Sequence, residues 1–390
     1  MHDKMTDRER FLAVALGQEP DYTPIFGFSG APGMSWGCLR TTHERLVATG
    51  MPAHVGGCTT NWQNRDVESW FRYWGTTGPI YPDFSLAWGA QGIGSTRREE
   101  DGFIIIEGED GSVTREMPDN ADNYCMPEFR VYPVRDRASW EFYKARTAPR
   151  EFMAPDDIEQ HCRRCEQRER PLVIGAGGTF GSVRSMMGTE AASLALYDDP
   201  ELVHDIIAVF RDYNRRYVFP LIERLRPEVV ACWEDIGYKT SMLLGPEQFR
   251  EFCAPLYREV ADCARACGVS VLTVDSDGCA MQLLPLLVEC GFNSLYPFEV
   301  KGSNDLFVLR EKFPDAVLFG WLEKEVINEG NEHLIEPEIR GKVPPLLAKG
   351  RYFPNGDHGI QPPATFAGLR RFMTVLHEVC NNPEGEFPRV

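Results

Sequence analysis

The chain has 390 residues, of which 43% are hydrophobic and 25% are charged, and its formal net charge is −17. This composition is sufficient for a large buried core and excludes a disordered chain. The negative charge argues against binding of nucleic acid or of an anionic membrane surface, because both require basic residues on the protein.

The N-terminus and the cysteines indicate a cytoplasmic protein. Met1–Arg10 is charged throughout and lacks the apolar core of a secretory signal. No apolar run approaches the roughly 18 residues that a membrane span needs. The 12 cysteines are scattered, as expected for reduced thiols. Cys162 and Cys165 form the one C-x-x-C pair, and no second pair completes a zinc site.

The first 150 residues contain few regular elements. Thr6–Gly17 predicts a capped helix, because Thr6 is a good N-cap residue and Glu9 stands three positions later. A short strand is expected at Ile25–Phe28. Residues 29–150 are rich in Gly, Trp and Tyr, and within them Gly102–Thr114 predicts a β-hairpin. We interpret 29–150 as a loop- and hairpin-rich insertion.

From residue 171 to residue 378 strands and helices alternate. The predicted strands are Pro171–Ala176, Glu228–Trp233, Val269–Val274, Ser294–Pro297, Val317–Gly320 and Tyr352–Pro354. The predicted helices are Pro200–Leu225, Pro246–Cys267, Met281–Cys290, Asn304–Phe313, Pro337–Lys349 and Pro363–Glu378. Such alternation requires parallel strands with helical crossovers. We predict an α/β fold in which residues 1–390 form one (β/α)8 TIM barrel domain.

An open doubly wound sheet is the alternative fold. The segment GAGGTFG at 175–181 is similar to a dinucleotide-binding loop. It lacks the G-x-G-x-x-G spacing, however, and no acidic residue follows a second strand about 20 residues later. The closed barrel is therefore favoured.

Acidic residues follow most of the predicted C-terminal strands. In chain order, the polar residues after these strands are Glu234, Asp235, Tyr238, Lys239, Asp275, Asp277, Glu299, Asp357 and His358. The carboxyl ends of barrel strands carry the active site, so these side chains should converge on one rim. Carboxylates packed together raise one another's pKa values unless a cation intervenes, and Lys239, Lys301 and His358 are available partners. The rim is either a network of caps and salt bridges or a site for acid–base or metal chemistry.

Several segments resemble the uroporphyrinogen decarboxylase superfamily, whose fold is a (β/α)8 barrel. These segments are TDRERFLAVALGQEPDYTPIF near the N-terminus, and then CWEDIGYKTSMLLGPEQFREFCAPLY, VLTVDSDG, NSLYPFE and YFPNGDHGIQPPATFAGL. The resemblance is strong over about 171–378, clear at 6–28 and weak between them. It implies one of two activities, either cofactor-free decarboxylation of a tetrapyrrole or cobamide-dependent methyl transfer.

The resemblance also indicates which activity to expect. The decarboxylases carry an arginine-rich R-Q-A-G-R-Y loop, whereas the matching stretch Phe28–Arg40 has one arginine. The methyltransferases hold zinc through H-x-C and a later G-C-G. In this chain the matching residues are Asp277, His358 and, from related synthases, Glu299. The resemblance thus implies zinc or another divalent metal on these three residues, with Asp275 beside them. The alternative is that the acids act directly without metal.

The first hypothesis is a methyltransferase that moves a methyl group between a small methylated substrate and a corrinoid on a partner protein. Glu234 or Asp235 would transfer protons, and Lys239 would orient an anionic group. Aromatic residues of the insertion would cover the substrate or corrinoid, or else form loop core: Trp62, Trp70, Tyr73, Trp74 and Trp88.

Two further hypotheses stay open. One is a metal-free decarboxylase of uroporphyrinogen or a related polycarboxylate, which would use Asp235, Tyr238 or His358 as acid–base groups. The other is a non-catalytic protein that binds a corrinoid or tetrapyrrole. The resemblance is compatible with a homodimer, because barrels of this superfamily commonly pair.

Overall fold

A computed structural model of the chain describes residues 4–28, 34, 37–56, 66–82, 88–90, 94–119, 126–145, 147–149 and 155–390. The α-helices are α1 Asp7–Ala15, α2 Arg40–Ala48, α3 Val67–Trp74, α4 Arg137–Lys144, α5 Pro155–Glu166, α6 Phe180–Met187, α7 Thr189–Asp198, α8 Pro200–Tyr213, α9 Phe219–Leu225, α10 Pro246–Gln248, α11 Ala254–Ala266, α12 Leu283–Glu289, α13 Leu306–Lys312, α14 Ile335–Leu347 and α15 Phe366–Cys380. The strands are β1 Trp88–Ala90, β2 Thr96–Glu100, β3 Phe103–Glu107, β4 Val113–Glu116, β5 Glu128–Val131, β6 Thr147–Pro149, β7 Val173–Ala176, β8 Val229–Trp233, β9 Val271–Asp275, β10 Ser294–Phe298, β11 Val317–Gly320 and β12 Tyr352–Phe353.

Six parallel strands form the central sheet in the order β12-β11-β10-β9-β8-β7. Each strand is followed by helical segments before the next strand, as the alternation of the sequence predicts. Two further segments continue the parallel pairing beyond β7. Ile80 bridges Leu172, and Phe26 bridges Thr77. The parallel α/β sheet is confirmed, whereas closure of an eight-stranded ring stays a prediction.

The inner face of the sheet packs on helix α1 at the amino end of the strands. One apolar cluster joins α1 to the first residues of successive strands, with Phe11, Val14, Ala15, Val173, Val229, Val271 and Val317 as members. The next residue along several of these strands, such as Ile174 or Val230, belongs to the outer core under the helices. Because strand side chains alternate between faces, both faces of this sheet are apolar and buried.

The predicted helices are present with ends shifted by a few residues, but α6 and α7, between β7 and α8, were not predicted, and the predicted helix Pro246–Cys267 contains a π-helical turn at Phe249–Cys253. The Thr6 side chain accepts a hydrogen bond from the Glu9 amide, and Glu9 accepts one from the Thr6 amide, so the capping box of α1 is present. The predicted helix Pro200–Leu225 is continuous in space but passes through a π-helical turn at Asn214–Val218. Within the described part of the chain, no helix has the length and apolarity that a bilayer crossing would require.

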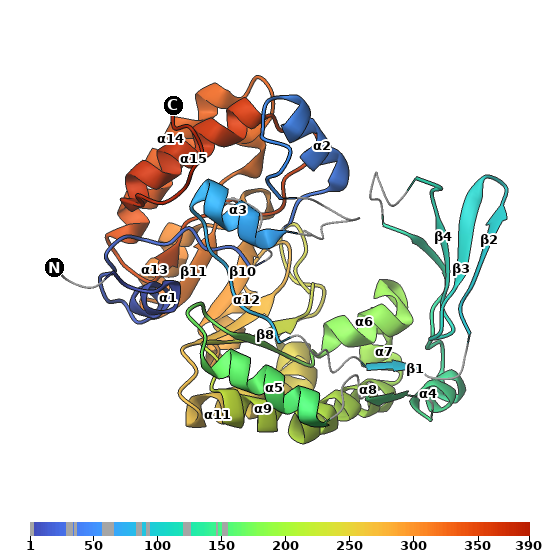
Figure 1. Cartoon of the computed structure of the whole chain (residues 1–390). Coiled ribbons are helices and arrows are strands. Elements are labelled where there is room, and N and C mark those ends of the chain that lie inside the picture. Colours follow the sequence, from blue (N-terminus) through green and yellow to red (C-terminus); the bar gives the residue numbers. More distant parts are fainter. Residues whose placement is uncertain are drawn as a thin grey trace.

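A separate antiparallel sheet of β2, β3, β4 and β5 projects from the body on the side away from α1 and the N-terminus (Figure 1). It contains the predicted hairpin, because β3 pairs antiparallel with β4. Helix α4 ties this region to the body, since Trp140 and Lys144 both donate hydrogen bonds to Asp205 of α8.

The aromatic residues of helix α3 form core. Trp70 and Trp74 are fully buried and Tyr73 is nearly so. The prediction that these three cover a substrate or corrinoid is therefore wrong, because each is packed inside the protein. Trp62 lies outside the described residues, and the side chain of Trp88 does too.

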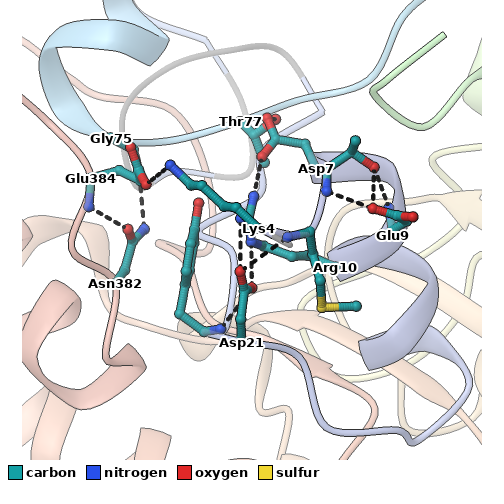
Figure 2. Close-up of polar contacts among 12 residues, drawn as sticks. Lys4, Asp7, Glu9, Arg10, Asp21, Gly75, Thr77, Asn382 and Glu384 are labelled. Carbon is teal, nitrogen blue, oxygen red and sulfur yellow. Dashed lines mark hydrogen bonds and ion pairs between the residues drawn. The ribbon is translucent and has the colours of Figure 1, made fainter. Parts of the chain in front are cut away.

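Ion pairs and hydrogen bonds hold the amino end of the molecule together (Figure 2). Arg10 donates to both oxygens of Asp21 and to Asp7, and Thr77 donates to Asp7 as well. Lys4 pairs with Glu384 near the C-terminus. Two surface cavities, of about 480 and 590 Å³, open in this region. Neither cavity is lined by any of the acidic residues that follow the strands.

Candidate active site at the carboxyl ends of the strands

Four of the predicted site residues lie close together at the carboxyl end of the parallel sheet. Asp235 follows β8, Asp275 ends β9, and Asp277 lies two residues later. Asp277 is 3.7 Å from His358, measured between Oδ2 and Nε2, and its amide donates a long hydrogen bond of 3.4 Å to Asp235. The structure therefore brings together three acids and one histidine from three different loops.

Close backbone contact fixes the loops that carry these acids. The Ser276 hydroxyl accepts hydrogen bonds of 3.1 Å from the amides of Ile236 and Gly237. A Cβ atom at Gly237 would lie 2.0 Å from the Asp277 carbonyl oxygen, so only glycine permits this approach. The loop after β8 and the loop after β9 are thus in direct contact, which keeps Asp235 close to Asp277.

Asp275 is the most strongly perturbed acid of the group. Burial, followed by the charges of Asp235 and Asp277, raises the pKa of Asp275 well above its usual range. A hydrogen bond with the Tyr296 hydroxyl opposes this shift but does not cancel it. Tyr296 is itself buried and stacks on Phe28 with ring centroids 4.0 Å apart. Asp275 therefore holds its proton over a wider pH range than an exposed aspartate and can act as a general acid.

Asp235 adopts a left-handed backbone conformation, with φ 48°, directly after strand β8. Burial raises the pKa of Asp235, and the nearby charge of Asp277 raises it further. Arg184 of helix α6 forms an ion pair with Asp235 at 3.5 Å and lowers this pKa in part. Asp235 is about one-third exposed and Asp277 about half exposed, so the cluster around the partly buried Asp275 is open to solvent.

Glu234 lies in a different environment from Asp235, although the two are adjacent in sequence. Its carboxylate is fully buried and accepts hydrogen bonds from the Thr179 hydroxyl (2.7 Å), the Gly181 amide (2.7 Å) and the Tyr257 hydroxyl (2.6 Å). A further bond comes from the Thr179 amide. This carboxylate caps the start of helix α6. Glu234 fixes the helix that carries Arg184 and does not face the other acids.

Glu299 and Asp357 connect the loops beyond the acid cluster. Glu299 accepts a hydrogen bond of 2.8 Å from the Gly278 amide. Asp357 is buried and accepts bonds from the amides of Val300 and Lys324. Burial raises the pKa of Asp357 to about 6. These contacts set the position of the loop that carries His358.

The predicted basic and aromatic partners lie on the surface. Tyr238 is 61% exposed and Lys239 is exposed as well. Lys301 pairs with Glu325. The cation next to the acids is instead Arg184, which the sequence analysis did not single out.

The predicted metal ligands do not assemble into a metal site. Among the described residues, no group of three or more His, Cys, Asp or Glu side chains is arranged to hold a metal ion. Asp277 faces His358, whereas the Glu299 carboxylate is bonded to the Gly278 amide. A metal bound by Asp277, Glu299 and His358 thus stays a prediction from the sequence. We therefore derive no step through a metal.

Three site residues had no usable signal in the sequence. Arg184, Tyr296 and Tyr81 come from a helix, a strand and a loop that are far apart along the chain. The Tyr81 side chain is half exposed, but its hydroxyl donates a hydrogen bond to the Phe28 carbonyl. Burial of this hydroxyl and the nearby charge of Asp275 both raise the pKa of Tyr81. The one available hint for Arg184 was its place eight residues after β7 on the rim side.

Comparison with known proteins identifies the family. The family model of uroporphyrinogen decarboxylase matches residues 132–379, which is more than half of the chain. The chain belongs to the uroporphyrinogen decarboxylase family. The resemblance read from the sequence is thereby confirmed.

A solved structure, a methyltransferase from Methanosarcina mazei, is similar over 97% of this chain and 98% of its own. The TM-score is 0.58 and the sequence identity is 15%, so this likeness concerns the fold. Among curated proteins, none matches the chain.

Proposed function

We propose that this protein is a methyltransferase that moves a methyl group between a small methylated substrate and a corrinoid carried by a partner protein. The observation that carries the proposal is the partly buried Asp275 next to two further carboxylates, one of which faces His358. The family and the fold shared with a methyltransferase support it. In this proposal the parallel strands close as an eight-stranded barrel between Phe26 and Asn355, whose side-chain amide donates to the Phe26 carbonyl.

Asp275 is the proton donor in the proposed reaction. The methyl group leaves an oxygen or nitrogen atom of the substrate with the carbon–heteroatom bond breaking, and the pair of electrons stays on the heteroatom. Asp275 gives its proton to that atom as the bond breaks, which avoids an unstable anion. The corrinoid supplies the nucleophile that accepts the methyl group. Tyr296 holds Asp275 in place through the hydrogen bond between its hydroxyl and the carboxyl group, and the Tyr81 hydroxyl, which donates to the Phe28 carbonyl, lies near the same acid.

In this proposal Asp235, Asp277 and His358 return a proton to Asp275 after each reaction. Asp235 is near enough to raise the pKa of Asp275 and is partly open to solvent. The Asp277–His358 pair connects to Asp235 through the Asp277 amide. A proton lost from Asp275 is restored from solvent through these groups in each turnover. Lys239, which is exposed, stays the predicted contact for an anionic group, and the exposed Tyr238 stays a predicted acid–base group of the decarboxylase alternative.

Decarboxylation is the second candidate, because the matching family model carries that activity in its name. A general acid such as Asp275 also suits protonation of a carbon that has lost carbon dioxide. A substrate with several carboxylates, however, needs several guanidinium groups. Among the described residues, Arg184 is the one arginine that pairs with an acid of this cluster. Methyl transfer is therefore favoured.

The test is an assay with the full-length protein and free cob(I)alamin. Loss of the cob(I)alamin absorbance would be followed with methyl ethers and methylamines as donors. Carbon dioxide release from uroporphyrinogen would be followed in parallel. Methyl transfer that is lost in Asp275→Asn and kept in the exposed control Asp315→Asn is the expected result. Decarboxylation alone would replace the proposal with the second candidate, and neither activity would favour a binding protein.

A further inference from the structure

Arg184 stands out because its side chain is largely buried and makes no hydrogen bond to the part of the chain that the structure describes. Its side chain is 22% exposed, and the Nε atom is buried with no hydrogen-bond partner. A terminal guanidinium nitrogen of Arg184 lies 3.5 Å from a carboxylate oxygen of Asp235, and the Cζ atom lies 5.5 Å from the centroid of the Trp233 ring. A guanidinium has five N–H donors in a planar fork, so most of its bonding capacity is unused.

Buried arginines elsewhere in the protein use that capacity. Arg168 donates to Glu228 and to the carbonyl oxygens of Cys165 and Arg226. Arg310 also has a buried Nε without a partner, but both of its terminal nitrogens donate to backbone carbonyls on two segments, whereas those of Arg184 make no hydrogen bond to the described residues. Burial of a charged group whose N–H donors lack hydrogen bonds is costly, and such donors are expected to find hydrogen-bond acceptors on a bound molecule. Arg184 thus differs from the arginines that stabilise the fold.

The position of Arg184 is fixed by the start of helix α6. The amides of Thr179 and Gly181 both donate to Glu234, which ties the first turn of α6 to the end of strand β8. A Cβ atom at Gly181 would lie 2.2 Å from the Glu234 carbonyl oxygen, so the helix and the strand end are in direct contact. Arg184 lies one turn further along α6. The backbone of Arg184 is therefore fixed next to the strand end, where its side chain lies against Asp235 and the Trp233 ring.

We propose that Arg184 binds a carboxylate of the substrate, so that the substrate class is a small methylated carboxylic acid. This inference rests on the proposed function, because it names the substrate class of the same site. A carboxylate matches the guanidinium fork with two parallel hydrogen bonds. A single arginine among acids favours one negative charge over a phosphate dianion. The Trp233 ring, which is 43% exposed, would lie along one side of the bound molecule.

Binding at Arg184 also explains the orientation that the reaction needs. Arg184 pairs with Asp235, and Asp235 lies next to Asp275. A molecule anchored by its carboxylate at Arg184 therefore extends over Asp235 toward the proton donor.

The test compares binding of matched acids and amides to the full-length protein. Dissociation constants would be measured by calorimetry for methoxyacetate against methoxyacetamide and for benzoate against benzamide, without corrinoid. Wild type should prefer the acid of each pair. Arg184→Gln should weaken binding of the acids about tenfold or more and leave the amides unchanged. Arg184→Lys should retain part of the preference, and Arg340→Gln, an exposed control on α14, should retain all of it.

The outcomes separate this inference from the proposed function. No preference for the acids in wild type, or an equal change for acids and amides in Arg184→Gln, would overturn the role of Arg184. Circular dichroism of each variant would show that the fold is kept. The protein could instead prefer acids in an Arg184-dependent way and yet transfer no methyl group to cob(I)alamin. That result would support the carboxylate site and reject methyl transfer as the function.

Discussion

The two ends of strand β8 carry acids in opposite surroundings. Glu228, just before the strand, is buried and accepts hydrogen bonds from Arg168, Arg8 and the Leu172 amide. Burial alone would raise the pKa of Glu228, but these partners outweigh it and lower the pKa. Asp235, just after the strand, meets Asp277 and a loosely paired Arg184, and its pKa is raised.

The difference separates the part of the protein that stabilises the fold from the part that performs chemistry. At the amino end Glu228 has cations and an amide that favour its charge. At the carboxyl end acids are placed against other acids, which costs stability and is retained where function needs a perturbed pKa. This division follows the general rule that the carboxyl ends of parallel strands carry the active site. Four predictions test it.

The largest expected effect is on activity at the carboxyl end. Asp275→Asn keeps the shape of the side chain and removes the proton donor, so methyl transfer should fall by about 10² to 10⁴-fold. The free energy of unfolding should stay the same or rise, because a buried acid next to two others is removed. Activity assays with cob(I)alamin and urea denaturation measure the two quantities. A variant that loses stability instead of activity would contradict the division.

The next effect is on stability at the amino end. Arg168→Met leaves the buried Glu228 carboxylate without its main partner, which should lower the free energy of unfolding by about 3 kcal/mol. The control is Arg163→Met, because Arg163 is 71% exposed in its pair with Glu159 and its loss should cost less than about 0.5 kcal/mol. Chemical denaturation measures the free energy of unfolding of both variants. Equal losses in the two variants would show that the Arg168–Glu228 pair does not stabilise the amino end more than a surface pair does.

The third effect is a pH dependence of stability from Asp357. Its pKa rises from an ordinary value of 3.8 to about 6 on folding, so the folded protein favours the protonated form. The resulting stability is fully present below about pH 4 and is lost as the pH rises through about 6, a change of about 2 to 3 kcal/mol. In Asp357→Asn this part of the pH dependence should disappear. Urea denaturation of both proteins between pH 4 and pH 7 measures this difference. If the free energy of unfolding of Asp357→Asn changes with pH as much as that of wild type, Asp357 is not the group responsible.

The smallest effect tests the cap of the helix that packs on the amino end. Thr6→Ala removes the side chain that accepts from the Glu9 amide, and the expected cost is about 1 kcal/mol. Activity should be unchanged, because α1 lies at the opposite end of the strands from the acids. Thermal denaturation measures the loss of stability. A fall in activity without a fall in stability would contradict the view that the amino end serves the fold and not the reaction.

The sequence by itself determined the parallel α/β arrangement, the capped first helix, the β3–β4 hairpin and the end of the sheet where acids gather. These features follow from periodicity, capping residues and turn residues, all of which act over short stretches of chain. The family resemblance followed from short segments in the same way.

The tertiary structure decided which acids face one another. Glu234 and Asp235 are adjacent and chemically alike, yet one caps α6 while the other joins Asp275 and Asp277. Arg184 and Tyr296 enter the site from distant parts of the chain, and Trp70 is core. Burial and charge pairing depend on side chains brought together across many residues, so local patterns could not determine them.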